Sequence, residues 1–392
     1  MIKACCIPIL FGFFCAAAFS AGAGEDVRHN VWHKIALDTV HVVSFVSDPA
    51  RPDTLYAVTS RGLLKSTDSG TQWVPLGTNL PESVLPSSVA VNHLNSRELY
   101  VSYDGAGIYK SSDGGNTWQA VNEGLPNLNV RCILISPKDP NLIYIGIMGG
   151  VALSTNGGRN WHMSSGFKRA VNVNAVAVDP KNPQYLFAAT GGAGVFKSGN
   201  GGVSWVDVNQ GLSSLSILAL HIDPENPDIV LAGAYHPATP TDFYVGEANG
   251  GVFRTVDGGR TWQETGLLTT TVFSFAAAPA YPGTVYAGAW GGAYRSVDKG
   301  ATWVDINSGL DNAFMHKLYV KPVEPPIILA GTTFGLLSYT DADLPKLLSA
   351  GDGVPPLVRY GSVCVAAAAV IGVCLLRRGR RRKTRDAERP VW

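Results

Sequence analysis

The stretch KSSDGGNTW, Lys110 to Trp118, brings a carboxylate, two glycines and a tryptophan close together. Taken alone, Asp113 in this stretch could be a catalytic or metal-binding acid. The chain, however, carries six near-copies, and their tryptophans are spaced by 45, 43, 44, 57 and 41 residues. The copies are KSTDSGTQW (65–73), KSSDGGNTW (110–118), LSTNGGRNW (153–161), KSGNGGVSW (197–205), RTVDGGRTW (254–262) and RSVDKGATW (295–303). A period of roughly 40 to 45 residues is typical of the blades of a β-propeller.

One repeat shows four predicted strands. VNAVAVDP (173–180) alternates apolar residues, and QYLFAATGG (184–192) is a β-rich run that ends in glycines. AGVFKSGNGG (193–202) leads into the tight loop and VSWVDVNQGL (203–212) leaves it. An isolated hairpin cannot bury its own faces in water, whereas stacked blades cover one another.

Seven first strands can be counted along the chain. They begin near Val40, Leu85, Asn129, Asn172, Leu215, Thr271 and His316. The sequence therefore predicts an all-β protein, a seven-bladed β-propeller. The seventh unit lacks the tight loop and its tryptophan, but VWHKIAL (31–37) matches the strands that follow the loop in other units. We expect residues 31–37 to pair with about Gly335 to Thr340 and so close the ring, which removes an exposed sheet edge.

The tight loop itself has a structural interpretation. An Asp or Asn side chain accepts hydrogen bonds from nearby N–H groups, glycine adopts positive φ without penalty, and tryptophan anchors the hairpin. Two copies carry Asn, which an acceptor role tolerates and an acid or hard-cation ligand does not. The residues assigned this role are Asp68, Trp73, Asp113, Trp118, Asn156, Trp161, Asn200, Trp205, Asp257, Trp262, Asp298 and Trp303.

The two ends of the chain differ from the middle. An apolar run after Lys3, followed by small residues, indicates a signal peptide rather than an uncleaved anchor. Near the other end, seventeen residues without a charge precede RRGRRRK, which indicates a transmembrane helix with a cytoplasmic basic tail. A C-terminal sorting signal is the alternative. The expected organisation is signal peptide 1–23, propeller 24–340, linker 341–359, transmembrane helix 360–376 and basic cytoplasmic tail 377–392. The propeller would then lie on the outer, periplasmic side of the cytoplasmic membrane.

Charge and cysteine content exclude several classes of function. Without residue 3 and the residues after 350, the chain has 21 basic and 27 acidic side chains, a net charge near −6. Nucleic acid is therefore not an expected partner. Only Cys132 remains in the exported part, so no internal disulfide is possible. Phosphate-loop, zinc-protease, paired-cysteine and serine-hydrolase motifs are absent there, and we expect no cofactor and no metal.

The six loops follow the pattern S/T-x-D-x-G-x-x-W, with Asn at two positions, and over about residues 31–340 the chain resembles the Asp-box, or BNR, repeat family of β-propellers. That resemblance extends to sialidases, xyloglucanase-type glycoside hydrolases, sortilin-type receptors and photosystem II assembly factors. A single seven-bladed ring with an N-terminal closing strand is most similar in layout to the assembly factors. The resemblance implies a binding site on the face opposite the Asp-box loops, lined by second-to-third strand loops and connections between blades.

On that face the repeat is irregular once. The 57-residue spacing contains AYHPATPTDFYVGEANGG (234–251), a long second-to-third loop of the kind that carries recognition sites. Arginine and aromatic side chains are favoured at interfaces. The candidate binding residues are Arg61, Tyr103, Asp104, Arg131, Lys168, Arg169, His236, Asp242, Tyr244, Glu247, Trp290, His316 and Lys317.

Catalysis is the less favoured hypothesis. A sialidase-like site would need an arginine triad, for which Arg61, Arg131 and Arg169 are the candidates, and the family's Phe-Arg-Ile-Pro signature is absent. If the protein is a glycoside hydrolase, Asp242, Glu247 and Tyr244 are the candidate catalytic residues. We expect instead a monomeric, non-catalytic propeller anchored in the membrane, acting as a scaffold or assembly factor for a membrane or envelope protein complex. Binding or hydrolysis of glycans is the alternative.

Overall fold

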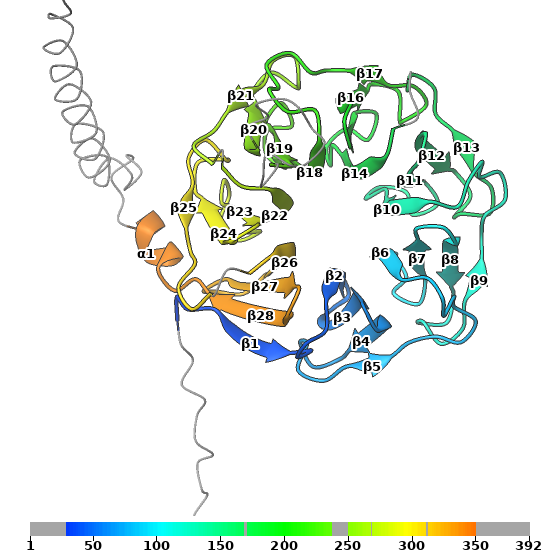
Figure 1. Cartoon of the computed structure of the whole chain (residues 1–392), viewed down its shortest axis with the longest axis horizontal. Helices are drawn as coiled ribbons and strands as arrows, with labels where there is room; N and C mark the ends of the chain where they lie inside the picture. The colour runs from blue at the N-terminus through cyan, green and yellow to red at the C-terminus, as the bar shows by residue number, and fades with distance from the viewer. Residues whose placement is uncertain (1–28, 168–170, 237–249, 268, 311–312, 350–392) are drawn as a thin grey trace, which may run out of the picture.

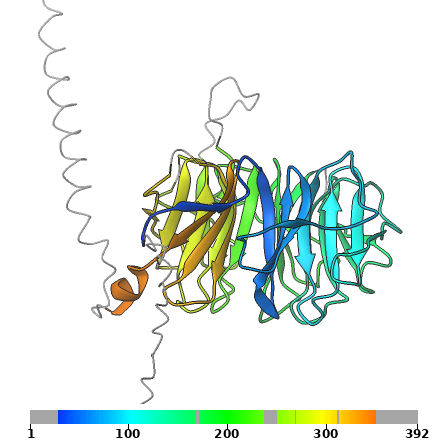
Figure 2. The ribbon, with the colours of Figure 1, turned by 90° about the horizontal axis from the view of Figure 1, so that it is seen from below.

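The computed structural model describes residues 29–167, 171–236, 250–267, 269–310 and 313–349. Their strands form seven four-stranded antiparallel sheets, arranged as blades around a central axis (Figure 1). Seen from the side, the ring is a thick disc whose strands run from one face to the other (Figure 2). The prediction of an all-β, seven-bladed propeller is confirmed.

Each blade contains an innermost, a second, a third and an outer strand. The innermost strands are β2 (Val42–Asp48), β6 (Pro86–Val91), β10 (Val130–Ile135), β14 (Val173–Val178), β18 (Ile217–Ile222), β22 (Val272–Ala277) and β26 (Met315–Lys321). The second strands are β3 (Arg51–Thr59), β7 (Leu99–Tyr103), β11 (Ile143–Ile147), β15 (Leu186–Thr190), β19 (Val230–Ala234), β23 (Val285–Ala289) and β27 (Ile327–Thr332).

The third strands all begin at a glycine with positive φ. They are β4 (Gly62–Ser66), β8 (Gly107–Ser111), β12 (Gly150–Ser154), β16 (Gly194–Ser198), β20 (Gly251–Thr255), β24 (Gly292–Ser296) and β28 (Gly335–Thr340). The outer strands are β5 (Val74–Pro75), β9 (Gln119–Ala120), β13 (His162–Met163), β17 (Val206–Asp207), β21 (Gln263–Glu264), β25 (Val304–Asp305) and, for the seventh blade, β1 (His33–Ala36).

Every innermost strand is irregular near its start. The pairing with the second strand shifts by one residue directly after the first pair, so one residue in each strand is bulged. The bulged residues are Val43, Ser87, Arg131, Asn174, Leu218, Phe273 and His316. The bulge recurs in all seven blades at one end of the channel, and these seven side chains therefore belong to one level of the ring.

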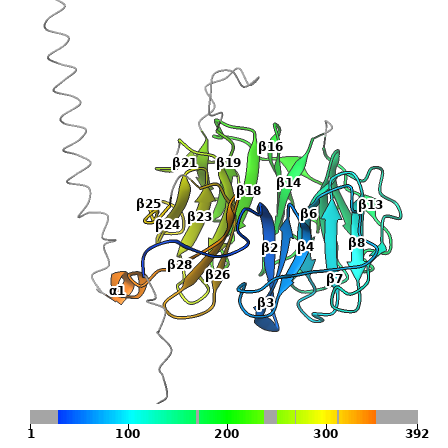
Figure 3. The same cartoon turned by 60° about the horizontal axis from the view of Figure 1, so that its bottom comes forward.

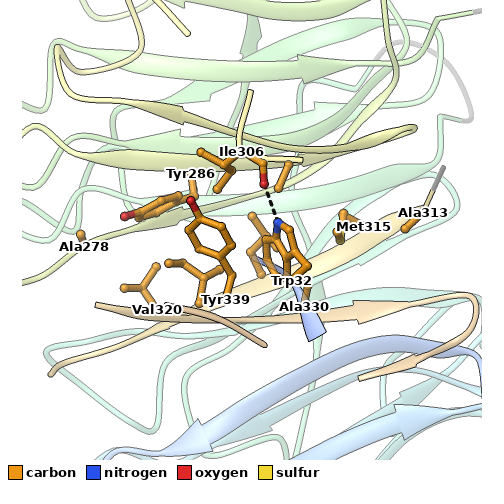
Figure 4. Close-up of a cluster of buried hydrophobic side chains, with 12 residues drawn as sticks. Trp32, Ala278, Tyr286, Ile306, Ala313, Met315, Val320, Ala330 and Tyr339 are labelled. Atoms are coloured by element: carbon orange, nitrogen blue, oxygen red, sulfur yellow. Dashed lines mark hydrogen bonds between the residues drawn. The ribbon is translucent and has the colours of Figure 1, made fainter. Parts of the chain in front are cut away.

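The ring is closed by the N-terminal strand, as predicted. β1 pairs antiparallel with β28, with His33 opposite Ser338 and Ala36 opposite Leu336. Trp32 is 3% exposed and packs against Tyr339, with ring centres 5.1 Å apart. Its Nε1 donates a 2.7 Å hydrogen bond to the carbonyl oxygen of Ile306 in the neighbouring blade (Figure 4). Trp32 thus joins blades 6 and 7, as Trp161 and Trp262 join their blades to the preceding ones.

A buried ion pair reinforces the same boundary. Asp341, the first residue of the segment expected to be a linker, is fully buried. Its Oδ1 accepts a 2.6 Å hydrogen bond from Arg295 Nη1, and its Oδ2 accepts one of 2.7 Å from the Tyr286 hydroxyl. Helix α1 (Leu344–Ser349) follows at the rim of the ring and buries Leu344 (Figure 1). The packed body of the propeller therefore extends past residue 340.

In all six Asp-box loops, the Asp or Asn side chain accepts hydrogen bonds within its own loop. Asp113 Oδ1 accepts from the Ser111 hydroxyl and from the backbone N–H groups of Asn116 and Thr117. Asn156 Oδ1 accepts the matching bonds from Ser154 and Asn160 N–H. These bonds lower the pKa of the Asp113 carboxyl, chiefly through the hydroxyl and N–H of Thr117. The carboxylate is therefore occupied in holding the loop.

None of the helices that the structure describes is long and apolar enough to cross a membrane. The expected signal peptide (1–23), transmembrane helix (360–376) and basic tail (377–392) lie outside the described residues.

Candidate functional site

The propeller has two unlike faces. Because each blade is antiparallel, the second-to-third strand loops and the connections between blades lie at one end of the strands, and the Asp-box loops lie at the other (Figure 3). We call the first end the upper face. There the loops of four blades form an isolated bridge with the residue that begins the next blade: Asp104 with Asn129, Met148 with Asn172, Gly191 with Ser216 and Trp290 with Phe314. These bridges tie the loops of four blades to the start of the next blade.

One sector of this rim is aromatic. Trp290 stacks on Phe314 with ring centres 4.8 Å apart, and Phe273 lies 6.4 Å from Phe314 and 5.4 Å from His316. His41 lies 4.5 Å from His316. We call these five residues the aromatic cluster. They come from blades 6, 7 and 1 and are all partly exposed, so the cluster presents rings to solvent rather than filling the core.

The two histidines of the cluster contact each other directly. His41 Nε2 and His316 Nε2 lie 2.9 Å apart, and His316 Nε2 also lies 3.1 Å from the Thr333 hydroxyl. Burial lowers the pKa of both imidazoles, and burial together with the charge of His41 lowers the pKa of His316 to about 4. The pair is therefore neutral at pH 7, with the N–H group of one ring donating a hydrogen bond to the other ring.

Lys317 follows His316 on β26 and pairs with Gly331 of β27. Six other blades carry a small residue at the equivalent position after the bulge: Ser44, Ser88, Cys132, Ala175, Ala219 and Ser274. Burial lowers the pKa of Lys317, and the Cys132 thiol has a small opposing effect.

Two candidate residues on the opposite sector form an ion pair. Arg131 Nη2 lies 3.5 Å from Asp104 Oδ2, and both side chains are close to half exposed. Arg61 is exposed on the loop between β3 and β4. Several apolar side chains are also exposed on the upper face. Exposed apolar side chains that form a contiguous patch are typical of interaction surfaces. They are Leu85, Leu128, Met148, Leu215 and Phe334.

The remaining candidates divide into three groups. Tyr103 is only 2% exposed and packs edge-on against Tyr109, so it belongs to the core between blades 1 and 2 rather than to the surface. The backbone of His236 is fixed by hydrogen bonds with the Thr271 hydroxyl. Lys168, Arg169, Asp242, Tyr244 and Glu247 lie outside the described residues.

Sequence reasoning missed three members of the cluster, His41, Phe273 and Phe314. His41 and Phe314 directly precede an innermost strand, and Phe273 is the bulged residue of β22. The alternation of apolar and polar residues in one sequence does not reveal a bulge. A signal was nevertheless present, because aligning the seven repeats places aromatic residues at these two positions mainly in blades 6 and 7.

Charged side chains are few on the described second-to-third strand loops of this face. Among the described second-to-third strand loops, Asp104 is the one carboxylate, and Arg131 pairs with it. The described residues contain no group of three or more His, Cys, Asp or Glu side chains that could hold a metal ion. Burial raises the pKa of the Cys132 thiol to about 12, which makes it unreactive at neutral pH.

The fold and this face define a seven-bladed β-propeller with an aromatic cluster on its upper face. No protein-family model matches the chain, and no curated protein sequence matches it either. Solved structures do. An ancestral GH74 enzyme matches with a TM-score of 0.63 and 21% identity over 78% of this chain and 45% of that one. The present chain thus spans less than half of that enzyme.

Two structures of YCF48 match over most of their own length. YCF48 bound to D1 peptide has a TM-score of 0.58 and 18% identity, covering 80% of this chain and 96% of that one. YCF48 from Cyanidioschyzon merolae has a TM-score of 0.57 and 18% identity, covering 80% and 100%. At these identities, the likeness shows the shared propeller fold.

Proposed function

We propose that this protein is a non-catalytic scaffold that binds a polypeptide partner through the upper face of its propeller. In the full proposal, the chain is exported, the segment 360–376 anchors it in the cytoplasmic membrane, and the propeller serves as an assembly factor for a membrane or envelope protein complex. Tethering beside the bilayer would raise its effective concentration toward membrane partners.

The observation that carries the proposal is the aromatic cluster. Partly exposed aromatic rings are the side chains that dominate protein interfaces, because they bury large area at low entropic cost. Here the ring closure and the bridge between Trp290 and Phe314 hold them in place before a partner arrives. The likeness to a YCF48 propeller solved with a bound peptide supports a polypeptide as the ligand.

Glycan hydrolysis is the second candidate, and the likeness to a GH74 enzyme favours it. Glycoside hydrolysis needs two carboxyl groups that flank the scissile bond. On the described second-to-third strand loops, Asp104 is the single carboxylate and its charge is already paired. The described part of the upper face therefore supports binding better than hydrolysis.

Photocrosslinking in native membranes tests the proposal. The full chain with a photoreactive group at Met148 should capture a discrete protein partner. The double variant Trp290→Ala, Phe314→Ala should capture at least about tenfold less, as expected when two interface aromatics are removed. Tyr185→Ala, which removes an exposed aromatic side chain from the opposite face, is the matched control. Unchanged capture by the double variant would refute the assignment of the face, whereas sugar release from a polysaccharide panel would favour the second candidate.

A further inference from the structure

The boundary between blades 7 and 1 gathers basic groups. His316 and Lys317 come from β26, His41 precedes β2, and Arg61 lies on the loop after β3. Ser60, the neighbour of Arg61, hydrogen-bonds to the backbone of His41, so this loop lies against the histidine pair. In the described part of the chain, no carboxylate forms an ion pair with any of these four residues.

Lys317 is not needed to fill space. Serine occupies the equivalent position in three blades and alanine in two, so the ring packs well around a small side chain there. Lys317 pairs with Gly331 on the neighbouring strand β27. A Cβ atom added at Gly331 would lie 2.8 Å from a methyl group of Val42. The side chain is partly exposed, and no carboxylate in the described part of the chain pairs with its ammonium group. A ligand that supplied negative charge would provide the missing partner.

The histidine pair beside it can change its charge when a ligand arrives. Between two neutral imidazoles, one N–H donates to one ring nitrogen, so each Nε2 is engaged in the free protein. Phe273 and Phe314 lie next to His316 and face it with aromatic rings, which stabilise a neighbouring cation. A bound carboxylate would let both rings become protonated and turn their N–H groups toward it.

We propose that Lys317, His316 and His41 form a carboxylate-binding site on the upper face, which takes an acidic side chain of the polypeptide partner and binds it more tightly at acidic pH. This inference rests on the proposed scaffold function and names the chemistry of the partner. The aromatic cluster continues directly from His316, so the site fits an acidic residue flanked by apolar ones.

The direction of the pH effect follows from the charges that face the pair. Thr333, Phe273 and Phe314 contact His316 and are uncharged, and the charge of His41 disfavours protonation of His316. Lys317, the next residue of β26, and Arg61, on the adjoining loop, are basic, so no described charge favours protonation of the pair in the free protein. In the complex a carboxylate raises the pKa of both histidines, and the complex binds more protons than the free components. Affinity therefore rises as pH falls from 7.5 toward 5.5, where glutamate carboxylates are still mostly ionised.

Titration of the full chain in detergent with fluorescent hexaglutamate, measured by anisotropy at pH 5.5 and 7.5, tests the site. We expect saturable binding that is at least about fivefold tighter at pH 5.5, and no binding of hexaglutamine. Lys317→Ser, a residue that three blades already accept, should weaken binding about tenfold or more, as loss of a charge-assisted contact predicts. Lys321→Met removes another lysine of β26 and should leave binding unchanged.

A second measurement separates a ligand site from a purely structural pair. In the chain labelled with ¹⁵N-histidine, hexaglutamate should raise the pKa of two imidazoles, and His41→Gln and His316→Gln should each remove one of these resonances. Absence of hexaglutamate binding, binding unaffected by Lys317→Ser, or preference for oligogalacturonate over hexaglutamate would overturn the proposal. Crosslinking of a partner through the aromatic cluster could still succeed in each case, so the scaffold function is tested separately.

Discussion

Closure of the ring by Trp32 can be tested through stability. The side chain is 3% exposed, packs against Tyr339 and Tyr286, and donates a hydrogen bond to Ile306 (Figure 4). Burial of about 200 Å² of indole at about 25 cal/mol per Å² contributes about 5 kcal/mol, and the hydrogen bond adds about 1 kcal/mol. Partial collapse of the site and the compact unfolded chain reduce this value. We expect Trp32→Ala to lower the free energy of unfolding by about 3–5 kcal/mol.

Urea denaturation of the full chain, followed by far-UV circular dichroism, measures the change. Trp32→Phe keeps most of the apolar contact and loses the hydrogen bond, so it should cost about 1–2 kcal/mol. His33→Ala alters an exposed residue of the same strand and should change stability by less than about 0.5 kcal/mol. If Trp32→Ala were no more destabilising than His33→Ala, β1 would not be what closes the ring.

Four further outcomes are expected. Asp341→Asn leaves buried Arg295 without its counter-charge and should destabilise the propeller by about 3–5 kcal/mol in the same assay, whereas replacing both residues by apolar ones should recover much of the loss. The urea midpoint should fall as pH drops from 6.5 toward 4. Burial lowers the pKa of His316 and of His221 to about 4, so in this range the unfolded chain takes up protons that the folded chain does not. The variant His221→Gln should reduce the dependence of the midpoint on pH. Ser111→Ala removes a buried hydroxyl that forms hydrogen bonds with three groups of the loop, and it should lower the free energy of unfolding by about 1–2 kcal/mol. Asp113→Asn should lower the melting temperature less, because Asn already occupies the equivalent position in two loops. Cys132 should react much more slowly with a maleimide reagent at pH 7 in the folded protein than in urea, because its raised pKa leaves little thiolate, and rapid labelling of the native chain would contradict that raised pKa.

The sequence predicted the architecture because its signal is repeated. Six copies of one loop and a regular spacing define the blades, and VWHKIAL could be matched to the missing strand by comparison with its equivalents. The pairing of β1 with β28 then follows from the need to cover a sheet edge. The blade count and the closing strand could therefore be predicted from the repeated sequence pattern and from the rule that a sheet edge is covered.

The candidate site was less accessible to sequence reasoning. Arg131, Trp290 and Lys317 lie at the end of the strands opposite the Asp-box loops, as expected, but the neighbours of each side chain depend on bulges and on which blades are adjacent. His41 and His316 are separated by 275 positions and meet only because the ring closes. Tyr103 was misjudged because a tyrosine near a loop can equally well turn inward, and here the core between two blades takes it.

The closing strand also decides how the propeller would respond to mechanical load. Asn30 N–H donates to the carbonyl oxygen of Thr340, and Ala342 N–H donates to the Asn30 side chain, so the incoming and outgoing chain lie together at blade 7. A force applied between these two points would act on the ladder between β1 and β28 and on Trp32, while the other six blades stayed unloaded. The tensile strength of the whole ring is therefore set by a four-residue strand and the single indole that precedes it.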